Sequence, residues 1–208
     1  MDPADGKFVT TMDQLTALYE APSDVSIAKQ IDHISDHYRA FIEAAPFFAL
    51  ATGGPDGLDC SPRGDAPGFV RVADGKTLMV PDRRGNNRID SLRNIMRDPR
   101  VALLFLIPGI GETIRVVGRA ALSIDPDLLA SFVVNGKAPC CVIVVTVEHV
   151  FYQCTKAIVR SKLWDPARHV DRNSLPTTGS ILAAHTAGRL GGAAHDRDQH
   201  ERTMAKLY

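Results

Sequence analysis

Residues 81–95, PDRRGNNRIDSLRNI, join the end of a predicted strand to a short predicted helix. Leu78 to Val80 are typical of a strand end, and Asn86 or Asn87 is suited to be the N-cap of the helix. The strand-to-helix junction is therefore the point from which we assign the rest of the fold. The expected apolar stripe of this helix is Ile89, Leu92, Ile95 and Met96.

This junction is suited to hold an anion. The free N–H groups of a first helical turn lie at the positive end of the helix dipole. Arg83, Arg84 and Arg88 add formal charge beside them. A phosphate is the expected guest. The alternative, an ordinary capped helix with solvated arginines, stays open from the local sequence alone.

The composition indicates one globular domain. The chain has 208 residues, 45% of them hydrophobic, and a formal net charge of zero. Zero net charge argues against a general nucleic-acid binder, which usually carries a basic surplus. No apolar run reaches transmembrane length, and the N-terminus MDPADGKFVT lacks a hydrophobic signal core, so we expect a cytoplasmic protein that binds no membrane.

Cysteine and histidine spacings give no metal motif. The four cysteines, at positions 60, 140, 141 and 154, form no CxxC pair, and we expect buried, reduced and inert thiols. His33 and His37 have a four-residue spacing, but no HExxH motif accompanies them. We therefore assign no metal ligands.

The first 45 residues are predicted to be helical. Thr11 and Gln14 have the spacing of a capping box, before a helix that should stop near Pro22. A second helix is expected to follow, because apolar residues recur there at steps of three and four. These residues are Ile27, Ile31, Ile34, Tyr38 and Phe41.

From Pro46 onward, short β segments alternate with turns rich in Gly, Pro and Asp. The Arg100–Ile107 segment is nearly continuous in apolar residues, so we expect it to be buried on both sides. Six or seven strands with few helices favour a closed barrel. The expected strands are 47–52, 58–63, 69–72, 76–80, 100–107, 112–124 and 140–154.

One further helix interrupts the strands. Asp125-Pro126 is typical of a helix start and Asn135-Gly136 of a helix end. We therefore expect a single domain over residues 1–208, with N-terminal helices over 1–45, a barrel over 46–154 and a helical segment over 155–208.

The chain lacks GxGxxG after a strand, GxxxxGK[ST] and GxSxG, which lowers the Rossmann, P-loop and α/β-hydrolase alternatives. Instead it resembles the pyridoxamine 5'-phosphate oxidase-like family of FMN-binding split-barrel proteins, over about residues 30–165. The resemblance implies a six-stranded split barrel and a homodimer with FMN sites at the interface. It rests on the order of SPRGD, TLMVPDRRGNNRIDSLRNI, DPRVALLFLIPG, ETIRVVGRA and KAIVRSKLW.

The resemblance also implies roles for single residues. Asn87 and Arg88, next to Arg83, match the FMN phosphate site, and Pro81 and Asp82 match residues that line the flavin ring. The remaining matches are Arg63 as a polar flavin contact, Thr113 as a contact to the partner subunit's flavin, and Arg160 and Trp164 as residues that close over the site. Trp164 could equally be a core residue.

The basic strand and the substrate-phosphate Arg-His pair of true pyridoxamine-phosphate oxidases are not recognisable here, which argues against vitamin B6 oxidation. No catalytic acid or base stands out, as expected where a flavin supplies the chemistry. We expect an FMN-dependent oxidoreductase that acts on a small organic substrate, with NAD(P)H as a candidate reductant. The alternatives are a non-catalytic module that binds flavin or haem, and a deazaflavin-dependent reductase.

Overall fold

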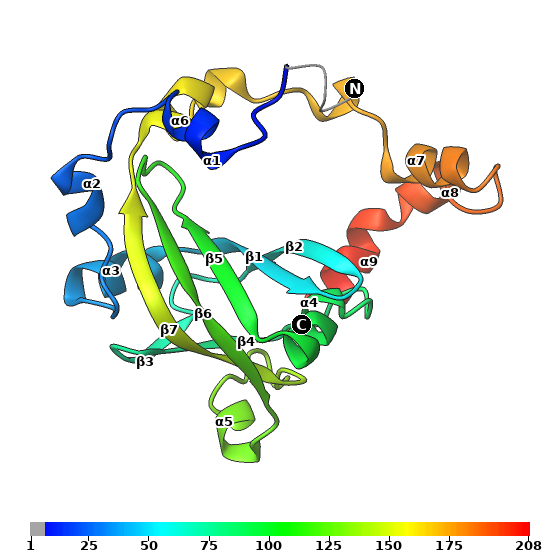
Figure 1. The fold of residues 1–208 in the computed structure, drawn as a ribbon. Helices are drawn as coiled ribbons and strands as arrows, with labels where there is room; N and C mark the ends of the chain where they lie inside the picture. The colour runs from blue at the N-terminus through cyan, green and yellow to red at the C-terminus, as the bar shows by residue number, and fades with distance from the viewer. Residues whose placement is uncertain (1–6) are drawn as a thin grey trace.

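The computed structural model describes residues 7–208 and shows a mainly β protein with flanking helices (Figure 1). One antiparallel sheet of seven strands, in the order β2-β1-β5-β6-β7-β4-β3, forms its centre. All seven strands expected from the turn-rich pattern are present, one more than the six that the family resemblance implies. The strands are β1 (Phe47–Gly54), β2 (Gly57–Gly64), β3 (Arg71–Asp74), β4 (Thr77–Pro81), β5 (Arg100–Leu106), β6 (Thr113–Ser123) and β7 (Val142–Gln153).

The sheet curls around its core (Figure 1). Alternate residues of each long strand point to opposite faces of a sheet. Burial follows this period along β1 and β5, so the expectation that residues 100–107 are buried on both sides was wrong. Phe48 and Phe105 pack with their ring centroids 5.0 Å apart inside the curl. Around them lie Leu50, Leu78, Val80, Leu103, Ile114, Val116, Ile143 and Val145, all almost fully buried.

Three short helices precede the sheet: α1 (Met12–Thr16), α2 (Asp24–Ala28) and α3 (Asp36–Ala44). The Thr11 side chain caps α1 as expected, by accepting a hydrogen bond from the Gln14 N–H. The single helix expected over residues 27–41 is wrong. Ile31 instead exchanges two backbone hydrogen bonds with Val150, which breaks the helix and leaves Ser35 to cap α3.

The helix between β6 and β7, α5 (Pro126–Ala130), starts as expected but ends earlier. Asn135 and Gly136 both have positive φ and form a tight turn closed by a bridge between Val134 and Lys137. Consecutive positive φ angles are typical of hairpin turns, so this Asn-Gly pair makes a hairpin and not a helix stop.

The C-terminal segment after β7 is helical, as expected, and extends away from the sheet (Figure 1), and Tyr208 then contacts Asp65 after the end of β2. Two 3-10 helices, Pro166–Arg168 and Arg172–Ser174, lie within it. None of the helices formed by residues 7–208 has the length and hydrophobicity that a membrane crossing requires. The α-helices of this segment are α6 (Lys156–Ser161), α7 (Thr178–His185), α8 (Gly192–Arg197) and α9 (Gln199–Ala205).

Helix α4 (Asp90–Arg97) packs against β1 and β2 and positions the loop that precedes it. Its buried residues are Ser91, Asn94 and Ile95, whereas Ile89 and Met96, expected on the apolar face, are 47% and 74% exposed. The expected N-cap at Asn86 or Asn87 was wrong as well, because Ile89 precedes the helix and has φ 53°. The polar residues Ser91 and Asn94 take the buried face because β1 and β2 offer them hydrogen-bond partners.

Asn94 fixes the height of α4 above the sheet. Its side chain donates to the Thr52 hydroxyl at 3.2 Å, and both residues are buried. A Cβ atom added to Gly54 would lie 2.5 Å from Asn94 Oδ1. Only glycine therefore allows the helix to come this close to β1.

We predict that Gly54→Ala lowers the free energy of unfolding by about 1 to 2 kcal/mol, because the added methyl group pushes against a buried, hydrogen-bonded side chain. Gly85→Ala is the control, since an added Cβ there meets no atom within 4 Å. Urea denaturation of both variants measures the difference. Equal stability of the two variants would show that α4 does not depend on this close approach.

Candidate functional site

A cleft of about 760 Å³ lies between β2, the end of β4 and the start of α4. The loop 82–89 forms one wall, and Asp59, Ser61 and Arg63 of β2 form the other. Five of the nine residues predicted for the site line this cleft: Arg63, Asp82, Arg83, Asn87 and Arg88. Pro81 is buried at the end of β4, directly before Asp82.

The loop holds two residues in the left-handed region, Asn87 with φ 59° and Ile89 with φ 53°. Asparagine tolerates this region, but a β-branched residue such as Ile89 is strained there, at a cost of roughly 1 to 2 kcal/mol. Asn86 restrains the same turn, because its side-chain oxygen accepts the Arg88 N–H at 3.0 Å. Strain of this kind is common where a loop is shaped for a ligand.

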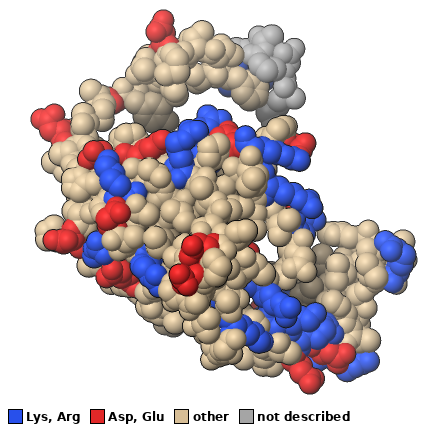
Figure 2. Space-filling view, turned by 90° about the horizontal axis from the view of Figure 1, so that it is seen from below, with Lys and Arg blue, Asp and Glu red and all other residues tan. Residues whose placement is uncertain are grey.

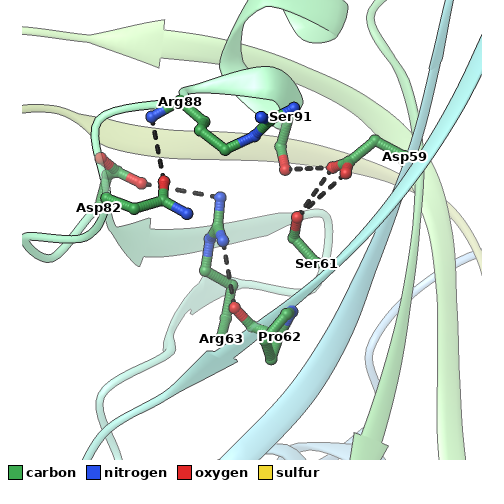
Figure 3. A network of polar contacts seen from close by, with 8 residues as sticks. Asp59, Ser61, Pro62, Arg63, Asp82, Arg88 and Ser91 are labelled. Atoms are coloured by element: carbon green, nitrogen blue, oxygen red, sulfur yellow. Dashed lines mark hydrogen bonds and ion pairs between the residues drawn. The ribbon is translucent and has the colours of Figure 1, made fainter. Parts of the chain in front are cut away.

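Arg63 is the central cation of the cleft. Its side chain points from β2 toward Asp82 and Arg88, as Figure 3 shows. Nη2 lies 3.8 Å from an Asp82 oxygen and Nη1 donates to the Pro62 carbonyl at 3.1 Å, but the buried Nε has no hydrogen-bond partner among residues 7–208. Burial raises the pKa of Asp82, and Arg63 only partly offsets that effect. Of the groups that line the cleft, the Arg63 Nε is thus a donor that the described residues leave unsatisfied.

Two serines and one carboxylate close the far side of the cleft (Figure 3). Asp59 accepts hydrogen bonds from Ser61 at 3.0 Å and from Ser91 at 2.6 Å. Ser91 lies in the first turn of α4, so this network ties the helix start to β2. The sequence analysis missed Asp59 and Ser91, because only the tertiary fold brings them together across 32 residues of chain.

Arg88 is an exposed cation of the cleft, with 73% of its side chain accessible, and its Nε donates to Asp90 at 2.8 Å. It lies beside the cleft, in the loop before α4 and not in the first turn of the helix as expected, because α4 begins only at Asp90. Figure 2 shows several groups of Lys and Arg side chains on one face of the molecule, with Asp and Glu side chains among them. An anion would therefore bind at one of these groups of basic side chains and not over the whole face.

Arg83 is held by the protein itself. Its Nε donates to Asp65 at 2.9 Å and its Nη1 to the Phe132 carbonyl at 2.7 Å. Asp65 also accepts the Tyr208 hydroxyl at 2.7 Å, across 143 residues of chain. Burial raises the pKa of Asp65, but the hydrogen bonds from Tyr208, the Ala66 N–H and Arg83 outweigh it and hold the pKa below its ordinary value.

The remaining three predicted site residues lie elsewhere. Thr113 starts β6, and its hydroxyl donates to Gln153 at 3.1 Å. Trp164 is half-buried and donates to the Ile110 carbonyl at 2.7 Å, near the loop between β5 and β6. Arg160 is exposed on α6. None of these three residues lines the cleft of the same chain.

The cysteines differ from expectation in burial. Only Cys141 is buried, and Cys60, Cys140 and Cys154 are exposed, all as free thiols. Burial, with smaller contributions from Asp82 and Cys140, raises the pKa of Cys141 to about 11. Within residues 7–208, no cluster of three His, Cys, Asp or Glu side chains could hold a metal ion.

We predict that Asp65→Asn lowers the free energy of unfolding at pH 7 by about 1 to 3 kcal/mol, since it removes a charged hydrogen-bond acceptor. A carboxyl group with a depressed pKa stabilises the fold above its ordinary pKa, and this contribution is lost as the pH falls through the lower value of the folded state. The difference from the parent should therefore shrink between pH 7 and pH 3 in urea denaturation.

The control for this variant is Glu148→Gln on β7, where the carboxylate is exposed and has no ion pair within the described residues. It should change the stability by less than about 0.5 kcal/mol at either pH. A difference for Asp65→Asn that stays constant from pH 7 to pH 3 would contradict the assigned direction of the pKa shift.

Solved structures of similar shape include HupZ of Group A Streptococcus, at 20% identity over 58% of this chain and 94% of the other, with a TM-score of 0.47. General stress protein 26 of Bacillus anthracis matches at 18% identity over 55% and 88%, with a TM-score of 0.42. An FMN-binding protein of Syntrophomonas wolfei matches at 13% identity over 55% and 86%, with a TM-score of 0.41.

No curated protein sequence matches this chain. The family model for pyridoxamine 5'-phosphate oxidase, in contrast, matches residues 34–154, which is more than half of the chain and includes every strand of the sheet. The matched region also contains the whole loop 82–89 and the helix α4. The chain therefore belongs to the pyridoxamine 5'-phosphate oxidase family.

Proposed function

We propose that the protein binds FMN in the cleft between β2 and α4 and acts as an FMN-dependent oxidoreductase on a small organic substrate. The observation that carries this proposal is a cleft of about 760 Å³ at the start of α4, lined by four arginines and three aspartates, in a chain of this family. Arg63, Arg83, Arg84 and Arg88 line it, and Asp65 already pairs with Arg83. A phosphate would find charge and backbone N–H donors together at the start of α4.

The residues that line the cleft are suited to bind FMN. The Nε of Arg63 is buried without a partner, and an unpaired buried donor costs roughly 1 to 3 kcal/mol unless a ligand accepts its hydrogen bond. Flavin carries acceptor atoms on its ring and anionic oxygens on its phosphate. We therefore assign Asn87 and Arg88 to the phosphate, and Pro81, Asp82 and Arg63 to the ring end. Bound flavin would supply hydride chemistry, for which NAD(P)H is a candidate donor.

We further propose that the curled sheet acts as a split barrel in a homodimer. The outer side of β1, β5 and β6 forms an apolar face, defined by Phe47, Ala49, Ala51, Leu104, Leu106 and Val117. Ala49 pairs with Leu104, and Leu104 pairs with Arg115 on the next strand. A second copy that covers this face would form an isologous interface.

A homodimer also gives a role to the residues that lie away from the cleft. Thr113 and Trp164 lie near the start of β6, and neither they nor Arg160 lines the cleft of the same chain. They could reach a flavin only in the cleft of a second copy. This arrangement agrees with the interface sites that the family resemblance implies.

We predict that Arg88→Ala weakens FMN binding by on the order of tenfold, because it removes a charge-assisted hydrogen bond to phosphate. Because the Arg88 side chain is highly exposed, we expect the loss of affinity to lie at the lower end of the usual range for such a bond. The control is Arg97→Ala, at the other end of the same helix, where the arginine pairs with Asp56. Quenching of flavin fluorescence gives both affinities. A parent protein that retains no FMN contradicts the proposal, as do two variants that bind like the parent.

We predict that the parent protein has twice the chain mass in light scattering at micromolar concentration. Leu104→Glu should produce monomers, because it places a charge in the centre of the apolar face. Ile124→Glu is the control, since Ile124 is 76% exposed and lies beyond the end of β6. A monomeric parent, or a dimeric Leu104→Glu protein, would show that this face is not the interface.

A further inference from the structure

Arg115 lies on the outer side of β6, among the residues of the apolar face. Its chain neighbours Ile114 and Val116 are almost fully buried and point into the core, so the Arg115 side chain points outward. It pairs with Leu104 on β5 and with Phe151 on β7. Arg115 is the one charged member of a row that crosses five strands, Pro62, Ala49, Leu104, Arg115 and Phe151.

The charge of Arg115 has no counter-ion in the same chain. The buried Nε of Arg115 has no hydrogen-bond partner among residues 7–208. None of the ion pairs formed within that part of the chain includes Arg115. The next row of the outer face also lacks Asp and Glu, since it consists of Cys60, Ala51, Ala102, Val117 and His149. A guanidinium keeps its charge at any ordinary pH, so this cation stays unpaired.

The Phe151 ring holds the Arg115 guanidinium in place. The guanidinium carbon lies 4.1 Å from the ring centroid, which is the geometry of a cation–π contact. This contact restrains the side chain before any partner binds, so less conformational freedom is lost on binding. The N–H donors of a guanidinium lie in one plane and match the two oxygens of a carboxylate. Arg115 is therefore preorganised for an anionic group that approaches the outer face.

A second copy of the chain is the partner that the surroundings of Arg115 favour. Among residues 7–208, no helix makes more than marginal contact with β5, so this part of the outer face has no cover in the same chain. The same surface is continuous with the apolar face that we assign to the homodimer. A second copy on this face would remove Arg115 from water, and an unpaired charge inside an interface is strongly unfavourable. The second copy must therefore bring an anionic acceptor.

We propose that Arg115 pairs with a carboxylate group of a second copy, and that this pair selects the second copy as the partner of the apolar face. In an isologous interface the contact is made twice, once by each Arg115. Any other apolar surface that covered the face would leave the cation unpaired, which gives Arg115 its role in specificity. The inference rests on the proposed homodimer and not on the binding of FMN.

Sedimentation equilibrium of the flavin-free protein tests the pair through Arg115→Met, an apolar replacement of similar length. Loss of the cation leaves the carboxylate of the second copy buried and unpaired, so the dimer dissociation constant should rise by on the order of a hundredfold. Arg115→Lys keeps the charge but not the planar fork, and should give a smaller rise. The control is Arg119→Met on the same strand, because Arg119 is exposed and pairs with Arg100 beyond the apolar rows. It should associate like the parent.

An arginine that only rests against Phe151 gives the opposite result. Arg115→Met would then remove an unpaired charge from an apolar face, and the dimer would be as tight as the parent or tighter. Either result overturns the pairing. A weaker dimer seen only in the FMN-loaded protein would assign the acceptor to the flavin phosphate, and would also overturn the carboxylate.

The same measurements separate this inference from the proposed function. A monomeric parent overturns the homodimer, and the pairing with it. A dimeric parent whose Arg115→Met variant is equally dimeric overturns the pairing alone. A dimer that retains no FMN but shows the expected loss with Arg115→Met supports the pairing and overturns only the flavin proposal.

Discussion

The candidate site depends on how α4 is seated against the first two strands. Asn94 donates to Thr52, Ser91 donates to Asp59, and Gly54 leaves room for the close approach. Buried polar pairs of this kind are specific in geometry, because an unmatched partner would leave a costly unsatisfied group. The seating decides where the helix begins, and the start of the helix decides where the loop 82–89 places its arginines.

The loop 82–89, which precedes α4, has a strained backbone. Ile89 keeps an unfavourable backbone conformation directly before α4, and Arg63 keeps a buried donor without a partner. Both features cost free energy in the protein alone, and the packed sheet beneath them is large enough to carry that cost. An acceptor atom of a bound flavin ring would satisfy the donor, which is why we interpret the two features together as shaping for a ligand.

Much of the fold could be predicted from local patterns. The turn-rich segments after Pro46 predicted seven strands to within two residues at almost every end, because alternation and turn chemistry are local signals. The start of α4 could not be predicted in this way. The residues on its buried face, Ser91 and Asn94, are polar, whereas the apolar pattern indicated Ile89 and Met96. The break at Ile31 was also invisible, since its partner Val150 lies far away in the sequence.

The residues of the candidate site also divide into those that the local sequence predicts and those that it does not. Residues near the loop, such as Asp82 and Arg88, could be found because one motif contains them, whereas Asp59 and Tyr208 reach the site only through the tertiary fold.

The most direct test of the account compares the affinities of the protein for FMN and for riboflavin, which lacks the phosphate. The account predicts that FMN binds at least about tenfold more tightly, through one charge-assisted contact or more. Equal affinities would contradict the phosphate site at the start of α4.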